Sequence, residues 1–300
     1  MKRVVSVSLG SSTRDHRVVT NICGEEFQIE RVGTDGDIRK AIALIRELDG
    51  KVDAFGMGGI SLYLYGKNNH QYVLKSALPI LAAARITPMV DGSGLKNTME
   101  RNVVRYLKEG LNIPLEQKKV LMVCGMERLG MAEAFHQMGC QMVYGDFMFV
   151  LDVSIPIKTL KGLHRVATVL MPIISRLPLK VLYPTGQSQD VNTPKFVKYY
   201  DQADIIAGDF LYIKKCLPLS IKDKIIVTNT VTAKDVEMLK ERGAKLLVTS
   251  TPELEGRSFG TNVMEAVAVA MIGKRPQDIT TEEYQKVLKE DVFKHRVVYF

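Results

Sequence analysis

The stretch from residue 118 to residue 146 most constrains how this chain of 300 residues can fold. It consists of four parts in order: an apolar run at 119–124, a turn bounded by Gly125 and Gly130, a run with apolar residues at helical spacing at 131–138, and a second apolar run at 141–144. This succession predicts a strand, a helix and a second, parallel strand, because a crossover helix usually joins parallel strands. Asp146 follows the second strand, 21 residues after Gly125.

That order matches the βαβ unit of dinucleotide-binding proteins, in which a helix N-terminus faces a pyrophosphate and an acid binds ribose hydroxyls. We therefore predict a bound nicotinamide dinucleotide, with NAD favoured over NADP because a carboxylate at 146 repels a 2′-phosphate. Glu127 stands where the fingerprint has its middle glycine, and its charge opposes a phosphate. A crossover without cofactor and a different adenosine-type ligand therefore stay open. The predicted cofactor-binding residues are Gly125, Met126, Arg128, Gly130, Asp146, Thr228 and Asn229.

Strand and helix signals alternate along the whole chain, which indicates an α/β protein with mostly parallel sheets. Its length favours two domains, and a polar segment with a proline at 110–117 is the expected boundary. The predicted parts are an α/β substrate-binding domain (1–112), a Rossmann-like dinucleotide-binding domain (113–275), and a C-terminal helix and tail (276–300) that can pack back on the first domain. Within the second half we expect a strand at 180–183 and a long apolar helix at 159–177. That helix belongs either in a core or at an interface between domains or subunits, the last of which would make the protein a homodimer.

Composition narrows the class of protein. The 41 basic and 33 acidic residues give a net charge of +8, but they are interleaved along the chain, so we expect a solvated surface and no nucleic-acid partner. No run of eighteen apolar residues exists, and the first apolar run is too short for a signal peptide. We therefore expect a cytoplasmic protein without a membrane partner. Four cysteines and five histidines are scattered along the chain, so no metal site is expected.

Loops that follow strands are the candidate sites, because ligands of parallel sheets bind beyond the carboxyl ends of the strands. The loop at 10–16 offers small hydroxyls and an arginine, which suit a carboxylate or a phosphate, although turns are often rich in serine and glycine. The loop at 251–262 is long and polar, as functional loops often are. Residues 184–186 and Asp209 are further candidates for the same cleft. The predicted substrate-binding residues are Ser11, Ser12, Arg14, Arg257, Ser258 and Asn262.

Lys96 is the candidate catalytic residue. It lies in a glycine-flanked loop (91–98) that opens a helix, where an amine can donate or accept a proton. Asp91 is the nearest acid in that loop and is predicted to orient it. An ordinary surface lysine is the alternative interpretation.

Three of these segments together resemble the shikimate/quinate dehydrogenase group: the serine-bearing loop at 8–12, Lys96 in a loop that opens a helix, and the glycine turn at 125–130. The resemblance implies an NAD(P)-dependent oxidoreductase that acts on a small anionic hydroxy or keto compound of the quinate or shikimate type. The chain departs from the group in three motifs: V-T-x-P-H-K is replaced by D-G-S-G-L-K, N-T-D-x-x-G has no counterpart before residue 118, and G-A-G-G-A is replaced by G-M-E-R-L-G.

Two other functions remain open on the same fold. One is a transferase that uses an adenosine-containing donor such as S-adenosylmethionine. The other is a non-enzymatic ligand-binding or regulatory protein, because a fold does not by itself determine an activity.

Overall fold

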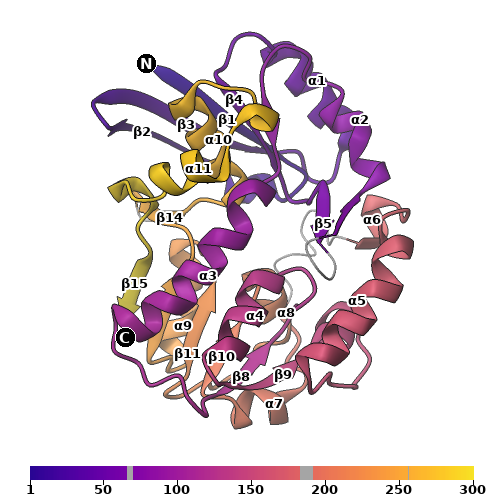
Figure 1. The fold of residues 1–300 in the computed structure, drawn as a ribbon, viewed down its shortest axis with the longest axis vertical. Helices are drawn as coiled ribbons and strands as arrows, with labels where there is room; N and C mark the ends of the chain where they lie inside the picture. Colours follow the sequence, from indigo (N-terminus) through magenta and orange to yellow (C-terminus); the bar gives the residue numbers. More distant parts are fainter. Residues whose placement is uncertain (66–69, 183–191, 256) are drawn as a thin grey trace.

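The computed structural model describes residues 1–65, 70–182, 192–255 and 257–300. The chain forms an α/β protein with two domains of mostly parallel sheets, one of five strands and one of six (Figure 1). The fold class predicted from the alternating pattern is therefore confirmed. None of the helices in the described ranges is long and apolar enough to cross a membrane.

The first sheet has the strand order β2-β3-β1-β4-β7, and all neighbours are parallel except the hairpin of β2 and β3. Its strands are β1 (Lys2–Ser8), β2 (His16–Ile22), β3 (Glu25–Gly33), β4 (Ala54–Gly58) and β7 (Met89–Val90). Alternate residues of β1 enter different cores: Val5 and Val7 pack with α1 (Ile38–Leu48) and α2 (Leu78–Leu81), whereas Val4 packs with α10 (Thr261–Ile272). Since side chains alternate between the faces of a strand, Ser6 and Ser8 share the α10 face.

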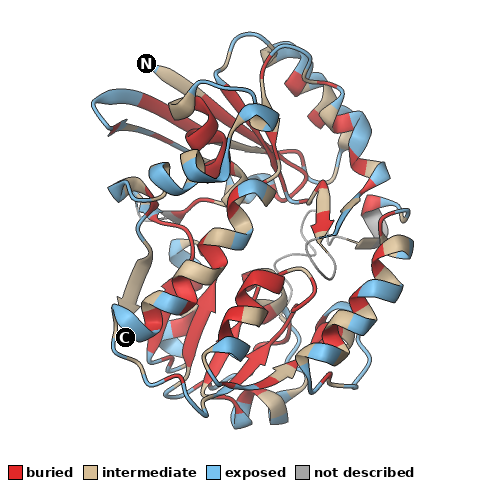
Figure 2. Ribbon diagram, viewed as in Figure 1, coloured by how far each residue is buried: buried red, intermediate tan, exposed pale blue. Residues whose placement is uncertain are grey.

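The second sheet has the order β15-β12-β11-β10-β8-β9, and only the edge strand β15 is antiparallel. Its strands are β8 (Lys119–Met122), β9 (Gln141–Tyr144), β10 (Ile205–Ala207), β11 (Ile225–Thr228), β12 (Leu246–Thr249) and β15 (Arg296–Tyr299). One face packs against α3 (Ser93–Glu109), α4 (Leu129–Gln137) and α5 (Leu160–Ile174). The other face packs against α7 (Val197–Gln202), α8 (Phe210–Cys216) and α9 (Ala233–Glu241). The inner strands are accordingly mostly buried, whereas the edge strand β15 and the outer helix faces are partly or fully exposed (Figure 2).

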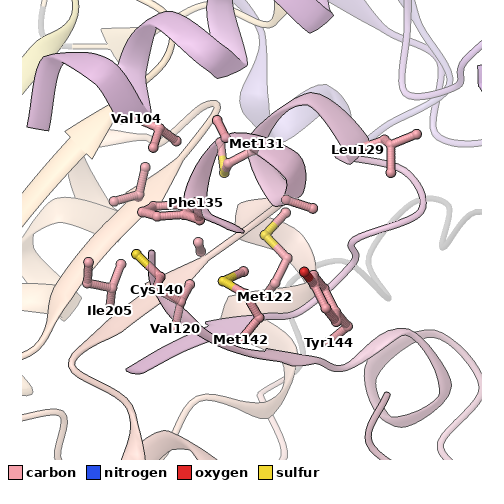
Figure 3. Packing of buried hydrophobic residues seen from close by; sticks show 14 of the residues in the cluster. Val104, Val120, Met122, Leu129, Met131, Phe135, Cys140, Met142, Tyr144 and Ile205 are labelled. Carbon is pink, nitrogen blue, oxygen red and sulfur yellow. The ribbon is translucent and has the colours of Figure 1, made fainter. Parts of the chain in front are cut away.

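The βαβ unit predicted from residues 118–146 is present as β8, α4 and β9. Met131 and Phe135 of α4 lie over Val120 and Met142 of the two strands (Figure 3). Gly130 lies where α4 meets α3: a Cβ at this position would stand 2.5 Å from Oδ1 of Asn97. The glycine therefore allows close helix packing, and its predicted role in binding the cofactor stays a prediction.

The C-terminal part of the chain is distributed between the two sheets differently from the expected domain boundaries. Helix α10, expected in the cofactor domain (113–275), packs on β1 and β4 of the first sheet. Strand β15 lies within the tail (276–300), yet it pairs with β12 of the second sheet. Burial explains the position of α10, because every residue from 263 to 270 is buried and needs apolar neighbours on several sides.

Two other expected elements also differ. Within the described residues, the segment expected as a strand at 180–183 is a short helix, α6 (Leu179–Leu182). Residues 183–191 lie outside the described residues, and so does the candidate site segment 184–186. Helix α5 buries one face and exposes Val169 and Ile173 on another, so it is not enclosed within a core. The remaining elements are the hairpins β5 (Tyr63–Tyr65) with β6 (Gln71–Val73) and β13 (Glu253–Leu254) with β14 (Arg257–Ser258), and the helix α11 (Thr281–Val287).

Candidate functional site

The carboxyl ends of strands from both sheets meet around one cavity of about 170 Å³. Residues that follow β1, β4 and β7 face residues that follow β8, β10 and β11. Polar side chains of the first wall include Ser6, Ser8, Arg14, Arg31, Asp91 and Asn262, and those of the second wall include Lys96, Glu127, Arg128, Asp209, Asn229 and Thr230. Open α/β sheets bind ligands at this end, so this cleft is the candidate site.

Serine hydroxyls of β1 form part of the first wall. Oγ of Ser6 accepts a hydrogen bond from Nδ2 of Asn262 at 2.7 Å, and Oγ of Ser8 accepts one from the amide of Gly10 at 3.1 Å. Gly58 of the neighbouring strand has no room for a side chain, since a Cβ there would stand 2.7 Å from Cβ of Ser8. Small residues on both strands therefore place these hydroxyls in the wall of the cleft, where Ser6 is 1% and Ser8 is 2% exposed.

Arg31 supports this wall from β3. Its guanidinium donates to Oγ of Ser8 at 2.9 Å and to Oδ1 of Asp15 at 2.7 Å. Burial, and next the nearby charge of Arg14, lowers the pKa of Arg31 to about 10. The group is still cationic at neutral pH, so this wall carries the charges of Arg14 and Arg31 together with that of Asp15.

Arg128 is the centre of the second wall. Its guanidinium donates to Oε1 of Glu100 at 2.9 Å and to Oδ2 of Asp209 at 2.6 Å, and Nδ2 of Asn229 donates to the same Asp209 oxygen at 2.8 Å. Burial disfavours the charge of Arg128, but Asp209 and Glu100 more than offset this and hold its pKa above the usual value. Burial likewise disfavours the Asp209 carboxylate, and Arg128 nevertheless keeps its pKa below the usual value. Arg128 and Asp209 are therefore both charged at neutral pH.

Lys96 lines the cleft from the first turn of α3, and Nζ lies 3.5 Å from Oε1 of Glu127. Asp91 also lines the cleft, but its carboxylate accepts hydrogen bonds from the amides of Leu62 (2.6 Å), Tyr63 (3.0 Å) and Ser93 (3.0 Å). The acid paired with Lys96 is thus Glu127. Asp91 instead orders the loops around it, which corrects the orienting role predicted from its position in the sequence.

Asp146 does not face an open crevice. It is 1% exposed, and its two oxygens accept hydrogen bonds from the amides of Gly125 (3.1 Å) and Met126 (2.8 Å). These are the amides that we predicted would hold a pyrophosphate. A Cβ on Gly125 would also stand 3.0 Å from both Leu163 and Tyr144, so the turn is closely covered. The predicted ribose contact of Asp146 is therefore wrong for this conformation. Burial raises the pKa of Asp146 to about 7, against the effect of the two amides.

The other predicted residues are divided between the cleft and the protein interior. Arg128, Asn229, Arg14 and Asn262 line the cleft. Thr228 is buried and donates to the carbonyl of Gly208 at 2.7 Å.

The three predicted serines do not line the cleft. Ser11 is buried and caps the turn at 12–14, the amide of Ser12 donates to Asp35 at 2.7 Å, and Ser258 is buried. The side chain of Arg257 lies outside the described residues.

Sequence reasoning missed Ser6 and Arg31, and it included Ser8 only as part of the serine-bearing loop at 8–12. The two serines did carry a signal, because hydroxyls alternate with valines at the carboxyl end of the first strand. Arg31 had none, since it reaches the site through the pairing of β1 with β3, where it stands opposite Ser6. Among the described residues, no three histidine, cysteine or acidic side chains come together in a way that would hold a metal ion.

No curated protein matches this sequence. Among solved structures, a galactofuranose binding protein is 13% identical, with 100% of this chain and 95% of that chain covered and a TM-score of 0.37. The periplasmic binding component of the arabinose ABC transporter from Shewanella sp. ANA-3 is 11% identical (96% and 95% covered, TM-score 0.37). The NAD-dependent malic enzyme from Thermotoga maritima is 13% identical (98% and 85% covered, TM-score 0.33). Similarities this low carry no argument about what the chain binds.

Two family models match the chain. Residues 3–91 match a domain of unknown function, DUF8753, which corresponds to the first sheet up to β7. Residues 94–300 match another domain of unknown function, DUF8754. Because this second match covers more than half of the sequence, the chain belongs to the DUF8754 family.

Proposed function

We propose that this protein binds a small anionic metabolite bearing hydroxyl or keto groups in the cleft between its two sheets. One observation carries the proposal: four cationic side chains from separate elements surround a single cavity, namely Arg14, Arg31, Lys96 and Arg128. Three acids line the same cavity, namely Asp91, Glu127 and Asp209, and two more acids, Asp15 and Glu100, pair with Arg31 and Arg128 from outside it. The proposal therefore depends on the N–H donors of these cations, which suit a carboxylate or a phosphate, and not on a net positive charge.

The two walls suit different ends of such a ligand. Ser6 and Ser8 accept hydrogen bonds from protein groups, so their own O–H protons can be donated to a carboxylate or phosphate beside Arg14. On the opposite wall Glu127 and Asn229 offer acceptors and donors to hydroxyl groups. The cavity, about 170 Å³, is smaller than the roughly 300–1,000 Å³ of sites for drug-sized ligands, which favours a small metabolite.

Arg14→Met is expected to weaken the binding of such an anion by about ten-fold or more, because a hydrogen bond to a charged group contributes about 1.5–3 kcal/mol. Calorimetric titration of quinate, shikimate and malate, each beside its uncharged methyl ester, measures this. Arg39→Met, on the exposed side of α1, is the matched control and should bind like the wild type. Equal affinity for acids and esters would count against a carboxylate at this wall.

Acid–base chemistry on the bound compound is a second candidate function, and the pairing of Lys96 with Glu127 supports it. If a keto acid binds with the CH₂ or CH₃ carbon next to its ketone near this pair, the protons on that carbon should exchange with solvent. NMR in deuterium oxide would then show exchange with the wild type, loss of exchange in Lys96→Met, and unchanged exchange in Lys161→Met, which replaces an exposed lysine of α5. Exchange that persists in Lys96→Met would remove this lysine from the chemistry.

An NAD(P)-dependent oxidoreductase, with NAD favoured, is a narrower form of the proposal. We rank it below anion binding and below acid–base chemistry because Asp146 occupies the amides of Gly125 and Met126 that a pyrophosphate would need. A transferase that uses S-adenosylmethionine at this turn meets the same obstacle. Thermal unfolding with NAD, NADP and S-adenosylmethionine separates these functions, since a ligand at a hundred times its Kd stabilises a protein by about 2.7 kcal/mol. Stabilisation by one of the three ligands would make the corresponding enzyme the leading proposal.

A further inference from the structure

A second cavity, of about 470 Å³, shares Asp91 with the cleft but is formed by other elements. It lies among the strand β5, the first turn of α3, and the helices α10 and α11. Its polar lining combines two acids with three tyrosines: Asp91, Glu265, Tyr63, Tyr65 and Tyr284. Apolar side chains from the segment 81–90 complete the wall.

Glu265 is the unusual group in this lining. It is 4% exposed, and Oε1 accepts a hydrogen bond from the hydroxyl of Tyr284 at 3.2 Å. Oε2 is fully buried and has no hydrogen-bond partner among the residues that the structure describes. Gly94, in the first turn of α3, makes room for this carboxyl group, because a Cβ there would overlap Oε1. Since a buried polar atom without a partner costs free energy, Oε2 indicates a contact that a ligand supplies.

The surroundings of Glu265 favour a positively charged partner. Asp91 adds a second acid to the same cavity, and aromatic rings such as those of Tyr65 and Tyr284 attract cations. The cations of the lining, Arg85 and Arg275, are exposed, so water screens their charge. We propose that this cavity binds an organic ammonium ion, with the ammonium group on Oε2 of Glu265 and an apolar body against residues 81–90.

Proton release should accompany this binding. Burial, and next the charge of Asp91, raises the pKa of Glu265 to about 8, although Tyr284 and the amides of Gly94 and Gly92 act in the opposite direction. Tyr63 and Tyr65 also face Glu265 and stay neutral, because burial raises the pKa of each. Glu265 is therefore protonated at neutral pH, and an ammonium ion that pairs with its carboxylate must displace that proton.

The test is a calorimetric titration at pH 7 with butylamine, benzylamine and phenethylamine, each paired with the alcohol of the same carbon skeleton. We expect at least one amine to bind saturably, the alcohols not to bind, and Glu265→Gln to weaken the amine at least ten-fold. Titration in two buffers of different ionisation enthalpy should show close to one proton released for each amine bound. Glu265→Gln keeps an acceptor for Tyr284 and is expected to fold.

Lys96→Met is the matched control in the neighbouring cleft, and it should bind the amine like the wild type. Equal binding to Glu265→Gln, binding of the alcohols as tight as that of the amines, or no saturable binding of any amine would each overturn the proposal. None of these results bears on the proposed anion site in the cleft, because that site is tested separately by Arg14→Met with carboxylate ligands.

Discussion

Arg128→Met is expected to lower the free energy of unfolding by about 3–5 kcal/mol, the range measured when one partner of a buried ion pair is removed. The side chain of Arg128 is 6% exposed and binds Glu100, which is 2% exposed, and Asp209. Methionine fills a similar volume but leaves both carboxylates without their cation, in a region that water hardly reaches. Because Asp209 lines the cleft, the same change should also weaken any anion bound there.

Urea denaturation at pH 7 measures this effect. Lys195→Met is the control, because Lys195 pairs with Asp152 on the exposed surface, where removing an ion pair has little effect. Adding Glu100→Gln to Arg128→Met should recover part of the loss, since it removes one of the two unpaired charges. A loss no larger than that of Lys195→Met would mean that water reaches these carboxylates, and the buried network would have to be reinterpreted.

Local patterns predicted much of the fold. Helix α1 carries such local signals, because its apolar residues recur at helical spacing and Asp37 is its N-cap: the carboxylate accepts hydrogen bonds from the amides of Arg39 and Lys40. The runs at 119–124 and 141–144 are β8 and β9, which pair in parallel as expected. These elements are defined by neighbours in the sequence, namely periodicity, caps and glycine stops, and such signals can be read from one chain.

Long-range contacts account for the elements that were missed. Strand β15 has no pattern of its own that separates it from a tail, and it forms because β12 offers an unpaired edge. Helix α10 packs on β1 and β4, which lie more than 200 residues earlier in the chain, and no local signal indicates this contact. The strand expected at 180–183 depended on an apolar run too short to separate a strand from the helix observed at α6.

Part of the candidate site could also be predicted from the sequence. Strand-end loops contributed Lys96, Arg128 and Asn229 to the cleft, because the carboxyl ends of parallel strands lie on one edge. The spacing of Gly125 and Asp146 was read correctly as a βαβ unit, but spacing does not tell whether the carboxylate binds a ligand or the turn itself. Here it binds the turn, since the two amides are its hydrogen-bond donors.

Glu265→Gln is expected to stabilise the protein in a pH-dependent way. The pKa of Glu265 rises from an ordinary 4.5 to about 8 on folding, chiefly through burial and next through Asp91. The contribution of this group to stability is therefore complete below pH 4.5 and is lost as the pH rises toward 8. One pKa unit corresponds to about 1.36 kcal/mol, so the wild type should lose roughly 4 kcal/mol across this range through Glu265, whereas the variant should not.

Thermal and urea unfolding of both proteins at pH 5 and pH 8 check this expectation. Asp146 also has a raised pKa, of about 7, and lowers stability in the same direction, but it is present in both proteins and its effect cancels in their difference. Glu282→Gln, an exposed change in the first turn of α11, is the control and should show no such dependence on pH. A constant difference between wild type and Glu265→Gln from pH 5 to pH 8 would mean that Glu265 is already ionised in the folded protein. Its buried Oε2 would then need a cationic or amide partner, and the second cavity is where that partner would have to be found.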